Sequence, residues 1–288
     1  MKELTPKQLA AKERRESERD EIRARLLLEI RHDLWSKISA CGDALPLTCV
    51  ACGDRTVASI RCKKRWCPCC AYNIAAERVS KYRLAATRFE WPLFITLTIR
   101  NSADVDSLRE IKKSFGKWRR RKLIRMKIKS GIVGFEVTNK GNGWHPHIHM
   151  LVDCRWLSIH VPEPNRKDTG EEKKRKCQAA AEELERCWSS CSNQDKTSVK
   201  IRRGDSDALI EVLKYSCKGS ELAECREAIA PLIDVMESMR LMTTFGEVRK
   251  TMKDEDVEEE ESKTCECKGC RGIGTILPDS VLAFAMRS

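Results

Sequence analysis

Two apolar, β-prone runs separated by a short turn constrain this chain more than any other feature of its sequence. The runs cover residues 131–138 and 144–152, and the segment Asn139–Gly143 lies between them. That segment is rich in residues that tolerate a positive φ, which favours a tight connection between strands. The sequence therefore predicts a β-hairpin, and with it an antiparallel sheet.

The second run of the hairpin carries three of the five histidines of the chain, at alternate positions. Alternate side chains share one face of a strand, so His145, His147 and His149 should lie together. A turn centred in the middle of the connecting segment places Glu136 opposite His147 on the same face. Two imidazoles and a carboxylate suit a catalytic divalent cation, Mg²⁺ or Mn²⁺, and the pattern leaves open which histidines are ligands.

The remaining periodicities predict an α+β fold, an antiparallel central sheet flanked by helices with a cysteine-rich insertion and a helical N-terminal extension. Four regions are expected: an N-terminal charged helix at 1–40, a cysteine-rich zinc-binding segment at 41–88, a domain with the central sheet at 89–250, and an acidic linker with a cysteine-containing tail at 251–288. Helices are expected at 7–38, 71–88, 107–129, 176–191 and 205–219, and further strands at 91–101 and 198–203.

The balance of charge indicates a polyanionic partner. The formal net charge is +12 and the isoelectric point is about 9.0, and clustered cations release counterions when they meet nucleic-acid phosphates. No run of residues is long and apolar enough for a membrane span, and the N-terminus is charged where a signal peptide is apolar. We therefore expect a cytoplasmic protein with no membrane partner.

Sixteen cysteines in a chain without an export signal point to metal ligation rather than disulfides. The pairs Cys49–Cys52 and Cys67–Cys70, each with two intervening residues, have the spacing of a structural zinc site. Competing ligands remain at Cys41, Cys62 and Cys69, and the tail cysteines Cys265, Cys267 and Cys270 stay unassigned.

Three tyrosines are present, and one of them lies in a setting that suits a nucleophile. Tyr72 and Tyr82 follow the cysteines on an expected helix, where packing explains them. Tyr215 lies on the helix expected at 205–219, at spacings of four from Glu211 and three from Lys218. That face would offer a nucleophile, a base and a cation, and a neighbouring ammonium such as Lys218 or Lys214 would favour the phenolate.

Three motifs occur in the order FITLT (94–98), WHPHIHML (144–151) and LKYSCK (213–218). With them the chain resembles the rolling-circle replication initiators of plasmids and phages, in the HUH endonuclease superfamily. The resemblance extends over residues 49–250, since the segments RCKKRWCPCC and RLMTTFG also resemble parts of that family. It implies an HUH endonuclease-like fold and a metal-dependent endonuclease that nicks and rejoins DNA.

The resemblance also implies roles for individual residues. The superfamily's metal-binding histidine pair maps onto His147 and His149, with Glu136 as the third ligand and His145 as an additional histidine. Tyr215 would form a 5′-phosphotyrosyl link and free a 3′-hydroxyl primer, and Glu211 would activate water to end the cycle. Implied partners are origin DNA, single-stranded or hairpin-extruded, with a host helicase and a replicative polymerase; a homodimer stays open.

Two other interpretations of the sequence remain. The chain could be a transposase or mobilisation relaxase of the same superfamily. It could also be a non-enzymatic zinc-containing DNA-binding regulator, in which the histidines are structural and Tyr215 packs in the core. The enzyme hypothesis requires the histidines, Glu136 and Tyr215 to converge.

Overall fold

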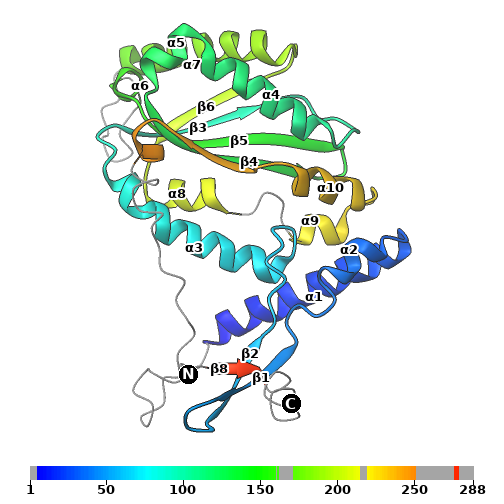
Figure 1. The fold of residues 1–288 in the computed structure, drawn as a ribbon. Helices are drawn as coiled ribbons and strands as arrows, with labels where there is room; N and C mark the ends of the chain where they lie inside the picture. Colours follow the sequence, from blue (N-terminus) through cyan, green and yellow to red (C-terminus); the bar gives the residue numbers. More distant parts are fainter. Residues whose placement is uncertain (1–4, 160, 162–170, 215–218, 251–275, 279–288) are drawn as a thin grey trace.

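The computed structural model describes residues 5–159, 161, 171–214, 219–250 and 276–278. These residues form an α+β fold around a five-stranded antiparallel sheet with the order β6–β3–β5–β4–β7 (Figure 1). An antiparallel central sheet flanked by helices is thus confirmed. The strands of this sheet are β3 (Pro92–Thr98), β4 (Ser130–Asn139), β5 (Trp144–Asp153), β6 (Ser198–Arg203) and β7 (Met242–Phe245).

The two faces of the sheet are covered by different helices (Figure 1). The face opposite the three histidines packs against α4 (Ser107–Arg120) and α7 (Glu171–Ser192), with α5 (Lys122–Lys127) following α4. The face that carries the histidines, here called the histidine face, packs against α8 (Ser206–Leu213), which in turn rests on α3 (Pro68–Thr87). Trp188 of α7 is fully buried and donates a hydrogen bond of 2.8 Å to the Thr98 carbonyl, which fixes α7 at the end of β3.

An N-terminal helix is present, but the expected helix 7–38 is two helices. A capping box between Thr5 and Gln8 starts α1 (Pro6–Leu28). The chain then leaves the helical conformation at Ile30, whose φ is 55°, and resumes in α2 (His32–Ser36). A β-branched residue with a positive φ cannot continue a right-handed helix.

Two side chains at the end of α1 bind the backbone of α9 (Gly219–Glu224) and of the start of α10 (Ala230–Ser238). One belongs to α1 itself, and the other belongs to Glu29, the residue after the helix. The Arg25 guanidinium donates to the carbonyls of Leu222 and Ala223, at 3.1 and 3.2 Å, and so satisfies carbonyls at the end of α9. The Glu29 carboxylate accepts from the N–H groups of Ile229 and Ala230, both at 2.9 Å, at the start of α10. The N-terminal helix is therefore part of the folded domain.

A second, smaller sheet lies apart from the first (Figure 1). Its order is β2–β1–β8, with β1 (Ala44–Cys49) and β2 (Arg55–Ser59) forming a hairpin and β8 (Ile276–Pro278) pairing with β1. Apart from β8, the expected linker and tail, with Cys265, Cys267 and Cys270, lie outside the described residues.

Two other expected helices end earlier than the sequence pattern indicates. The helix expected at 107–129 breaks at Arg121, whose ψ of 137° separates α4 from α5. The helix expected at 205–219 ends as α8 at Leu213, because Lys214 has a ψ of −171°. A short helix α6 (Arg155–Ser158) follows β5.

No helix in the described part of the chain has the length and hydropathy that crossing a bilayer requires.

Candidate functional site

The hairpin β4–β5 has the register that the sequence predicts. Glu136 pairs with His147, and the turn closes with Asn139 opposite Trp144. His145, His147 and His149 therefore share the histidine face with Glu136 and Thr138. The rings of His147 and His149 stack at 5.8 Å between centroids, and those of His145 and His147 lie 4.1 Å apart.

Each inner histidine has a defined polar partner. His149 Nε2 lies 2.7 Å from the Glu136 carboxylate, and His149 Nδ1 lies 3.2 Å from the Thr96 hydroxyl. His147 Nε2 lies 3.1 Å from the Thr138 hydroxyl. The contacts of both ring nitrogens, with Glu136 and with Thr96, fix the orientation of the His149 ring.

Burial and charge keep this cluster in a form that can donate electron pairs. Burial lowers the pKa of His147 to about 4, and the neighbouring His145 contributes to this shift, so the imidazole of His147 is neutral near neutral pH. For Glu136, burial opposes ionisation, but the hydrogen bond with His149 and the charge of Lys214 outweigh it and lower the carboxyl pKa. The neutral imidazole of His147 and the carboxylate of Glu136 are suitable ligands for a divalent cation.

Gly134 allows α8 to rest directly on the sheet beside the histidines. A Cβ at Gly134 would lie 2.2 Å from the carbonyl oxygen of Val212, so the backbone of α8 occupies the space that any other side chain needs. Gly134 pairs with His149 in the hairpin and lies two residues from Glu136 on the same face. This close approach brings the end of α8 to the histidine cluster.

Lys214, the residue after α8, links two carboxylates at this place. Its Nζ lies 3.5 Å from Glu136 Oε2 and 3.9 Å from Glu211 Oε1. The other oxygen of Glu211 accepts a hydrogen bond of 3.0 Å from Arg202. Glu211 is thus held at the edge of the histidine face by two cations.

Arg202 also belongs to a stack of three side chains that includes Phe94 and His149. The Arg202 guanidinium lies 4.1 Å from the centroid of the Phe94 ring. Phe94 in turn stacks on His149, with centroids 5.5 Å apart and an angle of 21° between the planes. These contacts connect Glu211 to His149 across β3 and β6.

Tyr215 and Lys218 lie outside the described residues. Among the described residues, α8 ends at Leu213 and Lys214 has a non-helical backbone. The structure places the residues on either side of positions 215–218. Lys214 lies beside Glu136, and Gly219 lies so close to α1 and α3 that a Cβ there would be 2.5 Å from Glu18 and 2.6 Å from Pro68.

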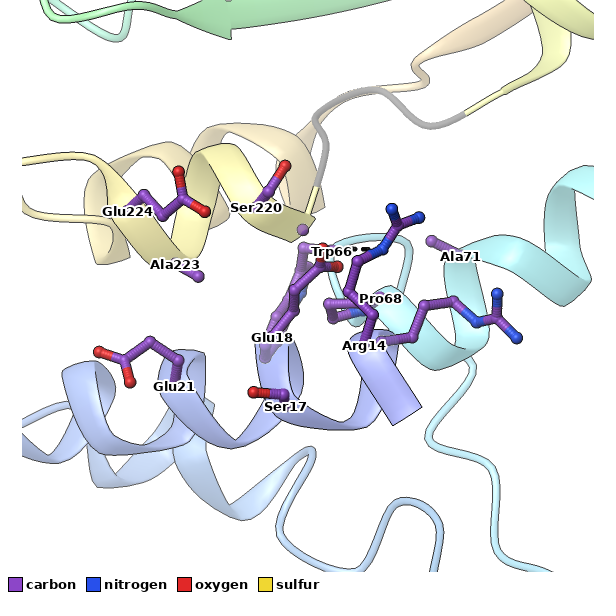
Figure 2. A pocket seen from close by; sticks show the side chains of 12 residues that line it. Arg14, Ser17, Glu18, Glu21, Trp66, Pro68, Ala71, Ser220, Ala223 and Glu224 are labelled. Carbon is purple, nitrogen blue, oxygen red and sulfur yellow. Dashed lines mark ion pairs between the residues drawn. The ribbon is translucent and has the colours of Figure 1, made fainter. Parts of the chain in front are cut away.

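A pocket of about 940 Å³ adjoins Gly219, between α1, α9 and the start of α3 (Figure 2). Figure 2 shows acidic side chains of α1 and α9 on one side of this pocket and Arg14 of α1 on the other. Arg14 and Glu18 form an ion pair of 3.7 Å. The pocket contains no part of the histidine cluster and lies apart from that site.

Four cysteines form the second candidate site. The sulfur atoms of Cys41, Cys62, Cys67 and Cys70 all lie within 4.8 Å of one another, and this is the one group of metal-ligand type that meets that criterion among the described residues. Sulfur–sulfur distances are 3.6 Å for Cys41–Cys67 and 3.5 Å for Cys41–Cys70 and Cys62–Cys70. A tetrahedron with zinc–sulfur bonds of about 2.3 Å has edges of about 3.8 Å, so the cluster fits a zinc ion.

The members of this cluster differ from the four cysteines expected from spacing alone. The spacing of the cysteines paired Cys67 and Cys70 with Cys49 and Cys52, but these last two lie at the turn of the β1–β2 hairpin, where Cys49 N–H bonds to Asp54 O. Antiparallel pairing over β1 separates the turn from the open end of the hairpin by about 20 Å. Cys41 and Cys62 flank the open end, where they meet the start of α3.

Cys69, the other competing ligand, is not in the cluster. Its thiol donates to the carbonyl of Arg15 at 3.5 Å and so links α3 to α1. Hydrogen bonding with Cys62, Cys69 and Cys70 raises the pKa of the Cys67 thiol, whereas hydrogen bonds to its sulfur lower that of Cys70.

Sequence reasoning missed several residues at the histidine site. Thr138 could have been found, because the same hairpin register places it opposite His145. Lys214 was expected only as a cation that favours the phenolate of Tyr215, and its contact with Glu136 was not foreseen. Arg202 carried no signal of its own, since an arginine in a basic chain has many explanations. Gly134 lies inside a strand pattern, where an isolated glycine indicates a close backbone approach.

One comparison with known proteins found a protein family that matches part of the chain. Residues 54–155 match the family Rep_1, described as a replication protein, over about a third of the chain. The matched part runs from the turn of the β1–β2 hairpin to the start of α6 and contains the histidines, Glu136 and three of the four clustered cysteines. No curated protein and no solved structure matches the chain.

Proposed function

We propose that this chain is a plasmid rolling-circle replication initiator that nicks and rejoins the origin strand of its replicon, from the premise that residues 54–155 match a replication protein family. The observation that carries this proposal is the convergence of His147, His149 and Glu136 with Lys214, because Tyr215 is the next residue in the chain. A tyrosine that follows a lysine in contact with a proposed metal ligand supports transesterification by that tyrosine.

We propose that His147, His149 and Glu136 hold a divalent cation, Mg²⁺ or Mn²⁺, with His145 as an auxiliary residue. Such a cation, when bound, supplies Lewis-acid polarisation of a phosphoryl oxygen. The hydroxyls of Thr96 and Thr138 orient the two inner imidazoles. The buried carboxylate of Glu136 supplies the negative charge that a hard cation needs.

In the proposed reaction the phenolate oxygen of Tyr215 attacks the phosphorus at the nick site. A tyrosine–phosphate bond forms, the bond from phosphorus to the 3′ oxygen breaks, and that oxygen gains a proton to become the primer hydroxyl. The phenolic proton is given up before or during attack, and the cations Lys214 and Lys218 favour the ionised phenol. The phosphotyrosyl link keeps the phosphodiester energy, so strand rejoining needs no ATP.

Glu211 is the residue we assign to the end of the cycle, as the base for a water molecule. Its carboxylate is fixed by Arg202 and Lys214, and Lys214 also lies beside Glu136. This bridge supports a carboxylate held close to the reacting phosphate, which is the position a general base requires.

The proposal implies specific partners. Origin DNA, single-stranded or hairpin-extruded, is the substrate, and the net charge of +12 supports binding to it. Strand displacement and synthesis then require a host helicase and a replicative polymerase. A homodimer stays open.

The proposed function is tested with supercoiled DNA that carries the gene and its flanking sequence. With Mn²⁺ present, we expect nicked circles to accumulate, and EDTA to abolish them. His147→Ala should lower the nicking rate by about 100-fold, because the variant lacks a ligand and its electrostatic contribution. The control is His32→Ala, which removes an exposed histidine of α2 and should leave nicking unchanged. Equal nicking by His147→Ala and the control would contradict the assignment.

A further inference from the structure

A basic hollow lies on the side of the sheet away from the histidine face. It has a volume of about 370 Å³ and is formed between α4, α5 and the edge strand β7. Five cations line it: Lys112, Arg119, Arg120, Arg125 and Arg240. No acidic residue is among the residues that line the hollow.

The cations of the hollow are not neutralised by carboxylates. Within the described part of the chain, none of the five forms an ion pair or a side-chain hydrogen bond with an acidic residue. Burial lowers the pKa of Lys112, and the charges of Arg240 and Arg65 lower it further. Burial and the charge of Arg249 also lower the pKa of Arg119. Cations that repel one another in this way attract an anion strongly.

Two features extend the basic surface beyond the hollow. Arg65, next to the cysteine cluster, donates to the carbonyls of Met236 and Met239 at the end of α10, which places its charge near Lys112. Arg249 follows β7 and lies near Arg119. The surface therefore runs from the cysteine-rich segment across α4 to the end of β7.

The chemistry of the hollow selects one kind of nucleic acid. Proteins that hold single strands combine cations with exposed aromatic rings on which bases stack. Here the aromatic rings are buried: Phe115 and Phe135 are 4% and 2% exposed, and Phe245 is 6% exposed with Arg119 4.4 Å from its ring. A surface of cations without a stacking platform fits the paired phosphate backbones of a duplex.

We propose that this hollow binds the phosphate backbone of double-stranded DNA next to the nick site. The proposal rests on the proposed function, and it gives the two faces of the sheet different tasks. The histidine face acts on the strand that is cut, and the basic hollow holds the duplex beside it without reading its sequence.

The test measures binding and nicking separately on full-length protein. Fluorescence anisotropy compares a 5′-labelled duplex of about 20 base pairs with one of its strands, at several NaCl concentrations. The variant Arg120→Ala/Arg125→Ala/Arg240→Ala removes three exposed cations of the hollow. Its affinity for the duplex should fall by about tenfold or more. The slope of log K against log [NaCl] should become shallower by about 1 for each phosphate that the variant no longer neutralises.

The control variant Lys113→Ala/Lys117→Ala/Lys122→Ala removes three exposed cations of the same two helices that do not line the hollow. We expect the control to keep most of the duplex affinity, and both variants to nick a saturating single-stranded substrate at the wild-type rate. An equal loss of affinity in both variants, or an unchanged duplex affinity in the first, would overturn the proposal. A wild-type protein that binds duplex through the hollow but never nicks DNA would instead overturn the proposed function alone.

Discussion

Cys70→Ser should remove one bound zinc ion per chain and lower the free energy of unfolding by about 3 kcal/mol or more. Cys70 is one of the four clustered cysteines, which come from three separate segments: the chain after α2, the chain after β2 and the start of α3. A zinc ion bound by all four thiolates cross-links these segments in the folded protein. The destabilisation should reach α1, because Cys69 in the same turn bonds to Arg15.

Zinc content by elemental analysis and urea unfolding followed by circular dichroism check this prediction. The control is Cys154→Ser, a buried cysteine outside the cluster whose thiol donates to the carbonyl of Lys127 at 3.3 Å. The control should keep its zinc and most of its stability. A Cys70→Ser protein with the zinc content and stability of wild type would show that the cluster is not a metal site.

Gly134→Ala should both destabilise the fold and slow the proposed nicking. The new Cβ would lie 2.2 Å from a backbone oxygen of α8, which cannot rotate away as a side chain could. Overpacking of this kind costs about 1–3 kcal/mol. Relief of the overlap moves α8 off the sheet, and a displacement of about 1 Å at a reacting group can cost about 100-fold in rate. Lys214 would move with the helix, away from Glu136.

Gly116→Ala is the matched control, because the nearest atom to its new Cβ is a side-chain nitrogen of Arg120 at 3.7 Å. That change lies within α4 and should stabilise the protein slightly, since alanine is favoured over glycine in helices. Unfolding curves and nicking rates per mole of folded protein, measured for both variants, separate the two effects. A Gly134→Ala protein as stable and active as the control would mean that α8 does not depend on its close approach to the sheet.

The histidine site was predictable because its geometry is local. A hairpin with a short turn has few registers, and the alternation of strand side chains then fixes which residues share a face. Glu136 could be placed opposite His147 from these two facts alone, and the structure has that register. The predicted strands of the central sheet follow from the same kind of short-range pattern.

The cysteine site was not predictable because its geometry is not local. Spacing favoured Cys49 and Cys52 as the partners of Cys67 and Cys70. The β1–β2 hairpin instead places Cys49 and Cys52 at its turn, far from the other two cysteines. Only the pairing of β1 with β2 identifies Cys41 and Cys62 as neighbours. A ligand set that depends on tertiary structure cannot be read from intervals in the sequence.

The end of α8 shows a second limit. Residues 205–219 have a helical pattern throughout, but the helix ends at Leu213, where its backbone lies on Gly134 and Lys214 turns to Glu136. Tertiary interactions here override the intrinsic preference of the chain, as they often do at helix ends. Glu211 keeps a place at the site through Lys214 and through Arg202, and the sequence pattern did not indicate the contact with Arg202.

The central claim is that Tyr215 forms a covalent bond with DNA, and trapping that bond tests it most directly. An oligonucleotide spanning the mapped nick, labelled at its 3′ end, is incubated with protein and Mn²⁺, and the product is separated under denaturing conditions. We expect a labelled protein whose modified peptide contains residue 215, and the same adduct with the control Tyr72→Phe. Tyr215→Phe should give none, whereas an adduct with that variant, or a label on another residue, would contradict the proposed mechanism.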